Sequence, residues 1–369
     1  MISKKILVVS SGFYPQISPR SFRTTELVKE LSRQGHRVTV HTYRDDMLHN
    51  KFEEEYDIKI NDLGKLKYPV LNIDKKNSFL SIVSRVVKRG MLQLFEYPDI
   101  ELLFLINSSL KKEKGYDLLI SVAVPYPVHW GVAKVITNNK ALTKVWIADC
   151  GDPYMGDKTD SFRKFFYFKY LEKWFCKKAD YITVPTAGSI NAYYPEFHKK
   201  IKVIPQGFNF EETKINEPFF KNIIPHFAYA GGFIPGIRDP KMLLEFLCRY
   251  KHPFKFIIYT TNSALVSAYI AASDNRIEVR PYIPRDKLLF ELSKMDFLVN
   301  INNGTNVQTP SKLIDYALTK RPVLSIESGM ADTTALEEFL QGNYSKEFKV
   351  DDLEKYNIKN VARQFLELS

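Results

Sequence analysis

The chain has 369 residues, enough for two domains that each bury a core of their own. Hydrophobic residues make up 45% and aromatic residues 14% of it, values that exclude wholesale disorder. Residues 1–200 hold 32 Lys and Arg against 22 Asp and Glu, a net charge of +10, whereas residues 201–369 hold 21 against 20. This imbalance indicates that the first half meets an anionic surface, either nucleic acid or a membrane, or is simply a basic protein surface.

The apolar run at residues 6–9 is too short for the core of a secretory signal or for a membrane-spanning helix. No other stretch reaches 18 uncharged apolar residues, so we expect a soluble protein or one peripheral to a membrane. Cys150, Cys176 and Cys248 are few and widely spaced, which argues against a disulfide framework or a zinc site. We therefore expect reduced cysteines and a cytoplasmic protein.

The first half predicts alternating strands and helices. An apolar strand at 5–10 is followed by a loop at 11–19, a helix at 20–34 that Gly35 ends, and a strand at 37–42. Further strands are predicted at 117–122, 144–148, 181–184 and 202–204, and further helices at 78–95 and 162–178.

The second half repeats this alternation after a polar segment. Strands are predicted at 226–230, 254–260, 277–280, 297–301 and 322–326, with helices between them. Two such series predict an α/β protein with two doubly wound, Rossmann-like domains that face a cleft. The predicted organisation is a first domain at 1–205, a linker at 206–225, a second domain at 226–356, and a last helix within 357–369 that crosses back to the first domain.

A polar motif follows the predicted strand at 297–301. The hydroxyl of Thr309 can cap a helix, and Pro310 suits the first helical position because its missing N–H would be unpaired there. Lys312 then lies in the first turn, beside free N–H groups that attract phosphate. Asp315 lies one turn (~5 Å) along the same face. These two residues fit a nucleoside diphosphate, with Lys312 on a phosphate and Asp315 on ribose; the structural alternative is a capped helix with an exposed ion pair.

Residues 309–326, TPSKLIDYALTKRPVLSI, resemble the nucleotide-sugar-binding motif of GT-B glycosyltransferases, in the large retaining family 4. The resemblance covers nearly the whole chain, is strongest at 227–326, and is to the type that assembles bacterial polysaccharides. It implies the GT-B fold and transfer of a sugar from a nucleotide diphosphate donor. Asp315 falls where that family carries the second Glu of its Glu-x7-Glu motif, which holds ribose. The first Glu falls at Val307, so that half of the motif is missing here.

Paired glycines, Gly231 and Gly232, follow a predicted strand in the second domain and let the backbone come close to a ligand. Asp239 is predicted to cap the next helix, with Pro240 at its first position. Arg238 lies beside that helix start and can bind a diphosphate through two N–H groups. The segment resembles the loop in which the same transferases neutralise the leaving diphosphate; a glycine turn with a solvated Arg is the alternative.

The loop after the predicted strand at 277–280 lines the base pocket in similar enzymes. The resemblance therefore assigns Tyr282 and Ile283 to the donor base, although a packed loop explains them nearly as well.

The loop after the first strand contains Gly12 but lacks the Gly-x-Gly-x-x-Gly pattern of a dinucleotide site, which argues against a nicotinamide or flavin cofactor. It resembles the first loop of the same transferases, which approaches the donor phosphates and the acceptor. Arg20 and Arg23 in the following helix are candidates to attract an acceptor phosphate; a basic helix face is the alternative.

His129 falls where related enzymes place a histidine that contacts the donor sugar, although a lone histidine is more often structural. Residues 149–154, DCGDPY, resemble the family's Asp-x-Arg-Asp-Pro-Trp segment, with Gly151 in place of Arg and Tyr154 in place of Trp. Asp152 is thereby assigned to the acceptor side, and a turn before a helix is the alternative.

Other chemistries find little support in the sequence. It contains no Asp-x-Asp to hold a divalent metal on a diphosphate and no His/Glu spacing for zinc, so no metal and no cofactor are expected. The segments at 78–95 and 162–178 mix basic with large apolar residues. This mixture favours peripheral association with an anionic membrane, expected to be the inner face of the plasma membrane. The alternative is that these helices only build the core.

The resemblance as a whole implies a retaining, metal-independent transferase of surface polysaccharide biosynthesis. Its donor would be a UDP-sugar, and its acceptor a saccharide or a polyprenyl-diphosphate-linked saccharide. Arg238, Lys312 and His129 are its predicted catalytic residues. A nucleotide-sugar epimerase of the same fold and a basic nucleic-acid-binding protein are the alternatives, and the latter lacks an RNA-binding or finger motif.

Overall fold

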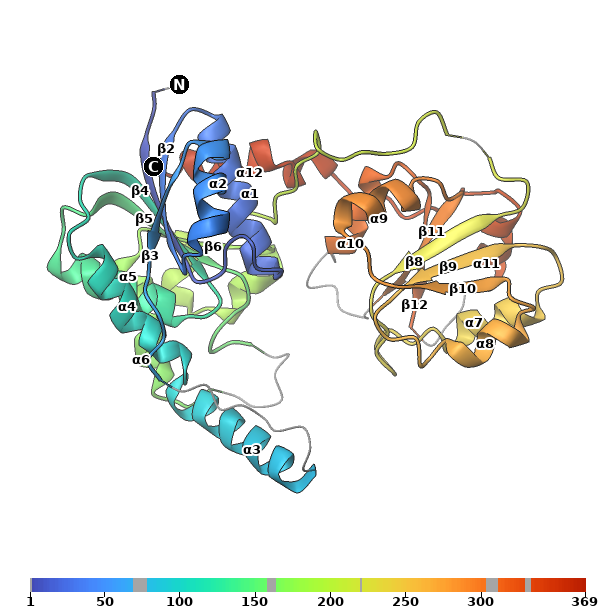
Figure 1. Ribbon diagram of the computed structural model, residues 1–369, viewed down its shortest axis with the longest axis horizontal. Coiled ribbons are helices and arrows are strands. Elements are labelled where there is room, and N and C mark those ends of the chain that lie inside the picture. Colours follow the sequence, from blue (N-terminus) through green and yellow to red (C-terminus); the bar gives the residue numbers. More distant parts are fainter. Residues whose placement is uncertain (1, 69–77, 158–163, 220, 303–310, 329–332) are drawn as a thin grey trace. The chain divides into compact units, whose positions relative to one another are not determined.

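The computed structural model describes residues 2–68, 78–157, 164–219, 221–302, 311–328 and 333–369. It divides into two compact units (Figure 1). Unit 1 comprises Met1–Phe208 with Tyr356–Ser369, and unit 2 comprises Asn209–Lys355. The segment at 209–225, where the sequence analysis places most of a linker, is thus part of unit 2: the backbone N–H of Asn216 donates to Ser293 Oγ at 2.7 Å.

The described residues of unit 1 form a seven-stranded parallel sheet in the order β3-β2-β1-β4-β5-β6-β7. The strands are β1 (Lys5–Ser10), β2 (Arg37–Thr42), β3 (Lys59–Asp62), β4 (Tyr116–Ala123), β5 (Thr143–Cys150), β6 (Tyr181–Val184) and β7 (Ile201–Val203). The helices are α1 (Pro19–Arg33), α2 (Asp46–Tyr56), α3 (Ser78–Phe95), α4 (Leu102–Leu110), α5 (Pro127–Asn138), α6 (Phe168–Lys178) and α12 (Ile358–Leu366).

Strand β1 shows why this sheet is covered on both faces. Ile6 and Val8 join one core with residues of α1, α2 and α12, while Leu7 and Val9 join another with residues of α4, α5 and α6. A parallel strand buried on both faces is expected to have a continuous apolar run rather than an alternating pattern, and residues 6–9 of β1 form such a run. The last helix, α12, therefore packs within unit 1 although it follows unit 2 in the sequence.

The described residues of unit 2 form a five-stranded parallel sheet in the order β10-β9-β8-β11-β12. The strands are β8 (His226–Ala230), β9 (Lys255–Tyr259), β10 (Ile277–Arg280), β11 (Phe297–Asn302) and β12 (Val323–Glu327). The helices are α7 (Lys241–Arg249), α8 (Ser267–Ala272), α9 (Arg285–Leu292), α10 (Ser311–Leu318) and α11 (Thr333–Leu340).

The two faces of this second sheet are also buried. Phe227 and Tyr229 of β8 belong to the core that includes α7 and α11, whereas Ala228 and Ala230 belong to the core that includes α9 and α10. Both units are thus doubly wound α/β structures, which confirms the predicted fold class.

Some elements differ from the sequence prediction. α2, β3 and α4 were not predicted; α2 buries only His49 and Phe52, which gives little helical periodicity to detect. α6 begins at Phe168 rather than at residue 162, and residues 158–163 lie outside the described part of the chain. Among the described helices, none is both long and apolar enough to span a membrane.

Each sheet reverses its strand order at one point. In unit 1 the reversal lies between β1 and β4, and in unit 2 it lies between β8 and β11. In open parallel sheets, ligands bind beyond the C-terminal ends of the strands at such points. A functional site is therefore expected at the loops after β1, β4, β8 and β11.

Candidate functional site

The loop after β8 in unit 2 begins with two glycines that have different roles. Gly231 has a φ of 141°, which other residues rarely adopt, and its N–H donates to the Tyr259 carbonyl at 2.9 Å. Gly232 faces open space, since a methyl group at this position would meet no atom of the described residues within 4 Å. The glycines therefore turn the chain sharply while keeping the end of β8 uncovered.

Two positive charges lie together beyond this turn, beside the ring of Tyr229. Lys312 Nζ lies 4.6 Å from the centre of that ring, and the charge of Arg238 acts on both Lys312 and Tyr229. Burial and the nearby Arg238 charge lower the pKa of Lys312 to about 7. Lys312 Nζ and Arg238 Nε are both buried, and neither has a hydrogen-bond partner among the described residues. We call these two residues the cation pair.

The cation pair is costly unless an anion satisfies it. Buried charged groups normally have partners, because removing them from water without one is unfavourable. The guanidinium of Arg238 can bind two oxygens at once, and the ammonium of Lys312 acts as a point charge. The arrangement suits an anion with two adjacent phosphate groups.

Asp315 lies one turn beyond Lys312 on α10 and pairs with a residue that the sequence analysis did not select. Arg285, the first residue of α9, donates to Asp315 Oδ1 from Nε at 2.9 Å and from Nη2 at 2.6 Å. Burial raises the pKa of Asp315, and the charge and hydrogen bonds of Arg285 oppose that rise. The only sequence signal for Arg285 was its place after Pro284 at a helix start.

Three other predicted features of this part of the chain, Thr309, Pro310 and Val307, lie outside the described residues. The helix after Arg238 begins at Lys241, so the predicted cap is displaced by one residue: Pro240 occupies the cap position. Asp239 still accepts a hydrogen bond from the Lys241 N–H at 3.0 Å.

The two residues assigned to the donor base differ in burial. Tyr282 is 61% exposed, whereas Ile283 is partly buried and packs against the core beneath α9 and α10. The exposed ring of Tyr282 is available to stack on a base. Ile283 contributes to core packing whether or not it also contacts a base. Their assignment to the base stays a prediction.

In unit 1, Arg23 has a buried partner that the sequence analysis did not foresee. Its Nε donates to Asp149 Oδ2 at 2.6 Å and its Nη2 to Asp149 Oδ1 at 2.7 Å, with side-chain exposures of 3% and 1%. Thr183 Oγ1 donates to the same carboxylate at 2.6 Å. Burial opposes ionisation of Asp149, but the Arg23 charge outweighs it and lowers the pKa. This corrects the expectation that Arg23 attracts an acceptor phosphate, because its guanidinium is committed to Asp149.

The other acceptor-side candidates remain accessible. Arg20 is partly buried in the first turn of α1, and its charge also favours ionised Asp149. Asp152 is exposed, and its carbonyl accepts a hydrogen bond from Tyr126 Oη at 2.5 Å. Gly12 allows the loop after β1 to approach α1, since a methyl group there would lie 3.3 Å from Ser21 N.

His129 lies inside unit 1 rather than at its surface. The side chain is fully buried, with Nδ1 2.8 Å from Ser121 Oγ and Nε2 3.4 Å from Cys150 Sγ. Burial lowers the pKa of His129 to about 3, so the ring is neutral at physiological pH. This geometry corrects the assignment of His129 to direct contact with the donor sugar: it is a satisfied core histidine, and none of its atoms is exposed.

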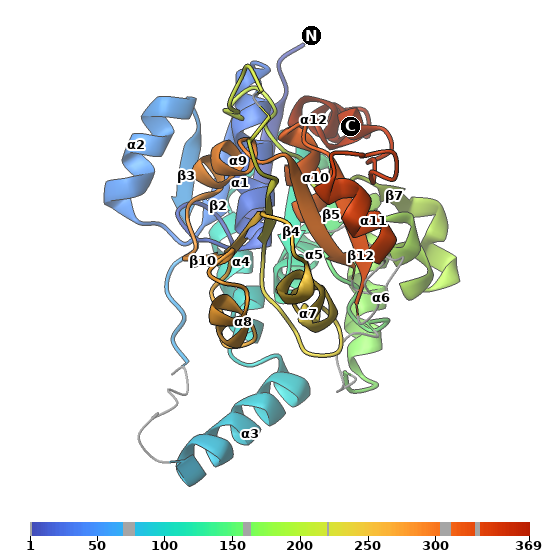
Figure 2. The ribbon, with the colours of Figure 1, turned by 90° about the vertical axis from the view of Figure 1, so that its right-hand side faces the viewer.

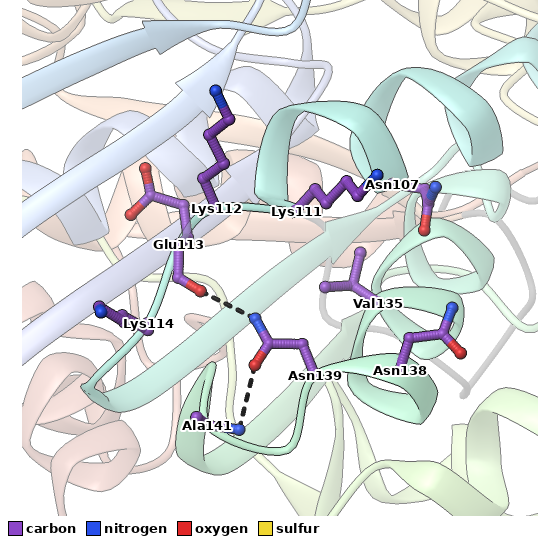
Figure 3. Close-up of a pocket in the computed structure, with 9 residues that line it drawn as sticks. All are labelled: Asn107, Lys111, Lys112, Glu113, Lys114, Val135, Asn138, Asn139 and Ala141. Carbon is purple, nitrogen blue, oxygen red and sulfur yellow. Dashed lines mark hydrogen bonds between the residues drawn. The ribbon is translucent and has the colours of Figure 1, made fainter.

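One cavity lined by described residues lies away from these candidate residues. It has a volume of about 540 Å³ and lies where α4 and α5 end and β4 begins, next to the side chain of Asn139 (Figure 3). Asn139 Nδ2 donates to the Glu113 carbonyl at 3.0 Å, and its Oδ1 accepts from the Ala141 N–H at 3.2 Å. Because it lies at the N-terminal edge of the strands, this cavity includes none of the predicted site residues.

A metal centre is not evident in the described part of the chain. No group of three or more His, Cys, Asp or Glu side chains there is arranged to hold a metal ion. The three cysteines are free, as expected from their spacing.

The comparisons with known proteins agree with this fold. The family model described as Glycosyltransferase Family 4 matches residues 22–212, more than half of the chain. A glycosyltransferase from Rickettsia africae is 13% identical, with a TM-score of 0.59, and the match covers 100% of this chain and 98% of that one. HepE from Anabaena, solved in complex with UDP, is 11% identical over 98% of both chains, with a TM-score of 0.59. TarM is 11% identical over 100% of this chain and 99% of that one, with a TM-score of 0.64. No curated protein matches the sequence.

Proposed function

The chain belongs to glycosyltransferase family 4 and has the GT-B fold, and from this premise we propose its donor, acceptor and mechanism. The donor is a UDP-sugar whose diphosphate binds the cation pair. The observation that carries this proposal is that Lys312 Nζ and Arg238 Nε are buried without a hydrogen-bond partner among the described residues, at the point where the strand order of unit 2 reverses. Structures of HepE with UDP and with UDP-glucose support UDP as the nucleotide.

The cation pair acts most strongly on the leaving group. As the bond from the sugar to the diphosphate breaks, negative charge grows on the phosphate oxygens, and fixed positive charges stabilise that transition state more than the ground state. Removing one such group costs about 2–4 kcal/mol, seen mainly in kcat. The two side chains also provide the charge neutralisation for which other enzymes use a metal ion. We therefore propose a metal-independent transfer.

The acceptor is a saccharide carried on a polyprenyl diphosphate, for the synthesis of a surface polysaccharide. Its hydroxyl oxygen bonds to the anomeric carbon on the face from which the diphosphate leaves, as the bond from that carbon to the phosphate oxygen breaks. The leaving phosphate accepts the hydroxyl proton, and attack on this face retains the anomeric configuration. In unit 1, Arg20 and Asp152 lie at the C-terminal edge of the sheet, where Arg20 attracts the diphosphate of such an acceptor.

Helix α3 supports a role at a membrane that carries this acceptor. Ile82, Val83, Val86 and Val87 are all exposed, with Val86 at 65%. At 100° per residue these four side chains share one arc of the helix, and the basic residues Arg85, Lys88 and Arg89 occupy another. Both views show α3 extending away from the unit 1 sheet (Figures 1 and 2). An apolar arc flanked by basic residues suits a helix that lies in the surface of an anionic membrane.

The aromatic residues before α6 extend the same surface. Tyr167 Oη donates to the Leu94 carbonyl at the end of α3, and Lys164 pairs with Glu96. These contacts join the segment before α6 to the end of α3, and Phe166 of that segment and Tyr170 of α6 have exposed rings. We define the α3 surface as the exposed apolar residues of these two segments: Ile82, Val83, Val86, Val87, Leu94, Phe95, Phe165, Phe166 and Tyr170. The net charge of +10 in residues 1–200 favours anionic lipid as its partner.

Binding and product analysis together test the proposed reaction. UDP should raise the melting temperature more than ADP or GDP, and Arg238→Ala and Lys312→Ala should each weaken this effect. With a UDP-sugar and a polyprenyl-diphosphate-linked saccharide, NMR of the product should show retained configuration, and EDTA should not reduce the rate. Absence of UDP binding in the intact protein would refute the donor assignment. A change of the donor without any acceptor would instead favour an epimerase.

A further inference from the structure

The pairing of Arg285 with Asp315 is asymmetric. Both nitrogens of Arg285 that contact the carboxylate donate to the same oxygen, Oδ1. No hydrogen bond from the described residues reaches Asp315 Oδ2, and the side chain is 21% exposed. One oxygen is therefore committed to Arg285, and the other is available to a ligand.

The position of Asp315 relates this available oxygen to the proposed donor site. Asp315 lies three residues after Lys312 on α10, which places it on the same face and about one turn (~5 Å) along the helix. A nucleotide whose diphosphate binds the cation pair extends over a similar distance to its ribose. The available oxygen can then accept hydrogen bonds from ribose hydroxyls.

We propose that Arg285 is a positioning residue for donor recognition: it orients the Asp315 carboxylate, so that Oδ2 accepts hydrogen bonds from the ribose hydroxyls of the nucleotide. This inference rests on the proposed function, because it needs a nucleotide on the cation pair. Arg285 itself acts through Asp315 and not by contact with the sugar.

The physical reason is the cost of burying a carboxylate. Burial opposes ionisation of Asp315, and the Arg285 charge is the principal opposing effect. Without Arg285, the carboxyl group would take up a proton at a higher pH and would be free to rotate. A neutral carboxyl group forms weaker hydrogen bonds with hydroxyls than a charged one, so ribose recognition would decline.

The test compares UDP with its 2′,3′-dideoxy analogue and with inorganic pyrophosphate by calorimetry. The intact protein should prefer UDP over the dideoxy analogue by about tenfold or more, which corresponds to about 1.4 kcal/mol. Arg285→Ala and Asp315→Asn should lose most of this preference at pH 6, and Arg285→Lys should retain part of it. In Arg285→Ala the preference should increase as the pH is raised, because the carboxyl group of Asp315 then ionises. Asp315→Asn has no carboxyl group at this position, so its preference should not change with pH.

Two controls separate this inference from folding and from the proposed function. Arg249→Ala removes an exposed arginine from α7 of the same unit and should leave the preference unchanged. Pyrophosphate should bind the Arg285 and Asp315 variants as it binds the intact protein, because it reports on the cation pair alone. If neither UDP nor pyrophosphate binds the intact protein, the proposed function fails. If UDP binds and Arg285→Ala keeps the full preference at every pH, the role of Arg285 is refuted.

Discussion

The guanidinium group of Arg20 occupies the space directly above Gly151. A methyl group at position 151 would lie 1.9 Å from the guanidinium carbon of Arg20, at the C-terminal end of β5. The Arg20 side chain of α1 therefore fills the space that a side chain at position 151 would take. A buried ion pair joins the same two elements. Its Arg23 lies about one helical turn after Arg20 on α1, and its Asp149 lies two residues before Gly151 on β5.

Substituting Gly151 by Ala should displace Arg20 with little loss of stability, because the end of an arginine side chain is flexible. If Arg20 attracts the acceptor diphosphate, Gly151→Ala and Arg20→Ala should both raise the KM for the acceptor by about tenfold, the value of one hydrogen bond to a charged group. UDP affinity should be unchanged in both variants. Steady-state kinetics at varied acceptor concentration measures this effect; an unchanged KM in both would remove Arg20 from acceptor binding.

Nucleotide binding should depend on pH through Lys312, whose pKa is lowered to about 7 by burial and Arg238. A bound diphosphate favours the charged ammonium and raises that pKa. Below pH 7 the residue is already charged, whereas above it binding must take up a proton, so UDP affinity should fall as the pH rises from 7 towards 9. The fall approaches about tenfold per pH unit at most. Calorimetry in buffers of different ionisation enthalpy measures the proton uptake directly. Lys312→Arg keeps its charge throughout this range and should show no such uptake; equal uptake in both proteins would contradict the assignment.

Stability should depend on pH through Glu172, a fully buried carboxyl group of α6. Burial raises the pKa of Glu172 to about 7, and no hydrogen bond from the described residues reaches its Oε2. The folded protein thus favours protonated Glu172, and this contribution to stability is complete below pH 4.5 and is lost as the pH rises to about 7. Glu172→Gln should therefore be more stable than the natural protein at pH 8, by up to about 3 kcal/mol, and similar to it at pH 4. Denaturant unfolding at both values measures the difference. A variant that is equally destabilised at both would show that the carboxyl group is not neutral in the folded state.

Membrane binding should require the apolar arc of α3. We expect the protein to sediment with vesicles that contain anionic lipid at low salt, and to be released as salt rises, because screening weakens the attraction of basic residues. Val86→Glu should reduce this binding several-fold and leave UDP affinity intact. Met47→Glu is the matched control, since Met47 is an exposed apolar residue of another unit 1 helix, α2. Equal effects of the two variants, or equal binding to neutral vesicles, would leave the α3 surface without this role.

The sequence by itself predicted the fold class and most of the elements that carry the candidate donor site. The four central residues of β1, at 6–9, are all apolar because the strand is buried on both faces, and that pattern is local. Gly231 was detectable as one of two glycines that follow a predicted strand, and the structure gives it a φ of 141°, which few other residues adopt. Lys312 and Arg238 were identified because a cation at the start of a helix beyond a strand has a local signature. Each of these features depends on neighbours in the sequence.

Only the tertiary structure decided which charges meet. Arg23 and Asp149 are 126 residues apart, and Arg285 and Asp315 are 30 apart, so no local pattern relates them. The strand order brings α1 over the end of β5, and it is this packing that commits Arg23 to Asp149 instead of to a ligand. His129 is likewise placed by packing, since burial beneath Phe175 and Cys150 decides that its ring is neutral and enclosed. Burial and ion pairing are properties of the packed sheet and its helices, which residue type and spacing alone do not determine.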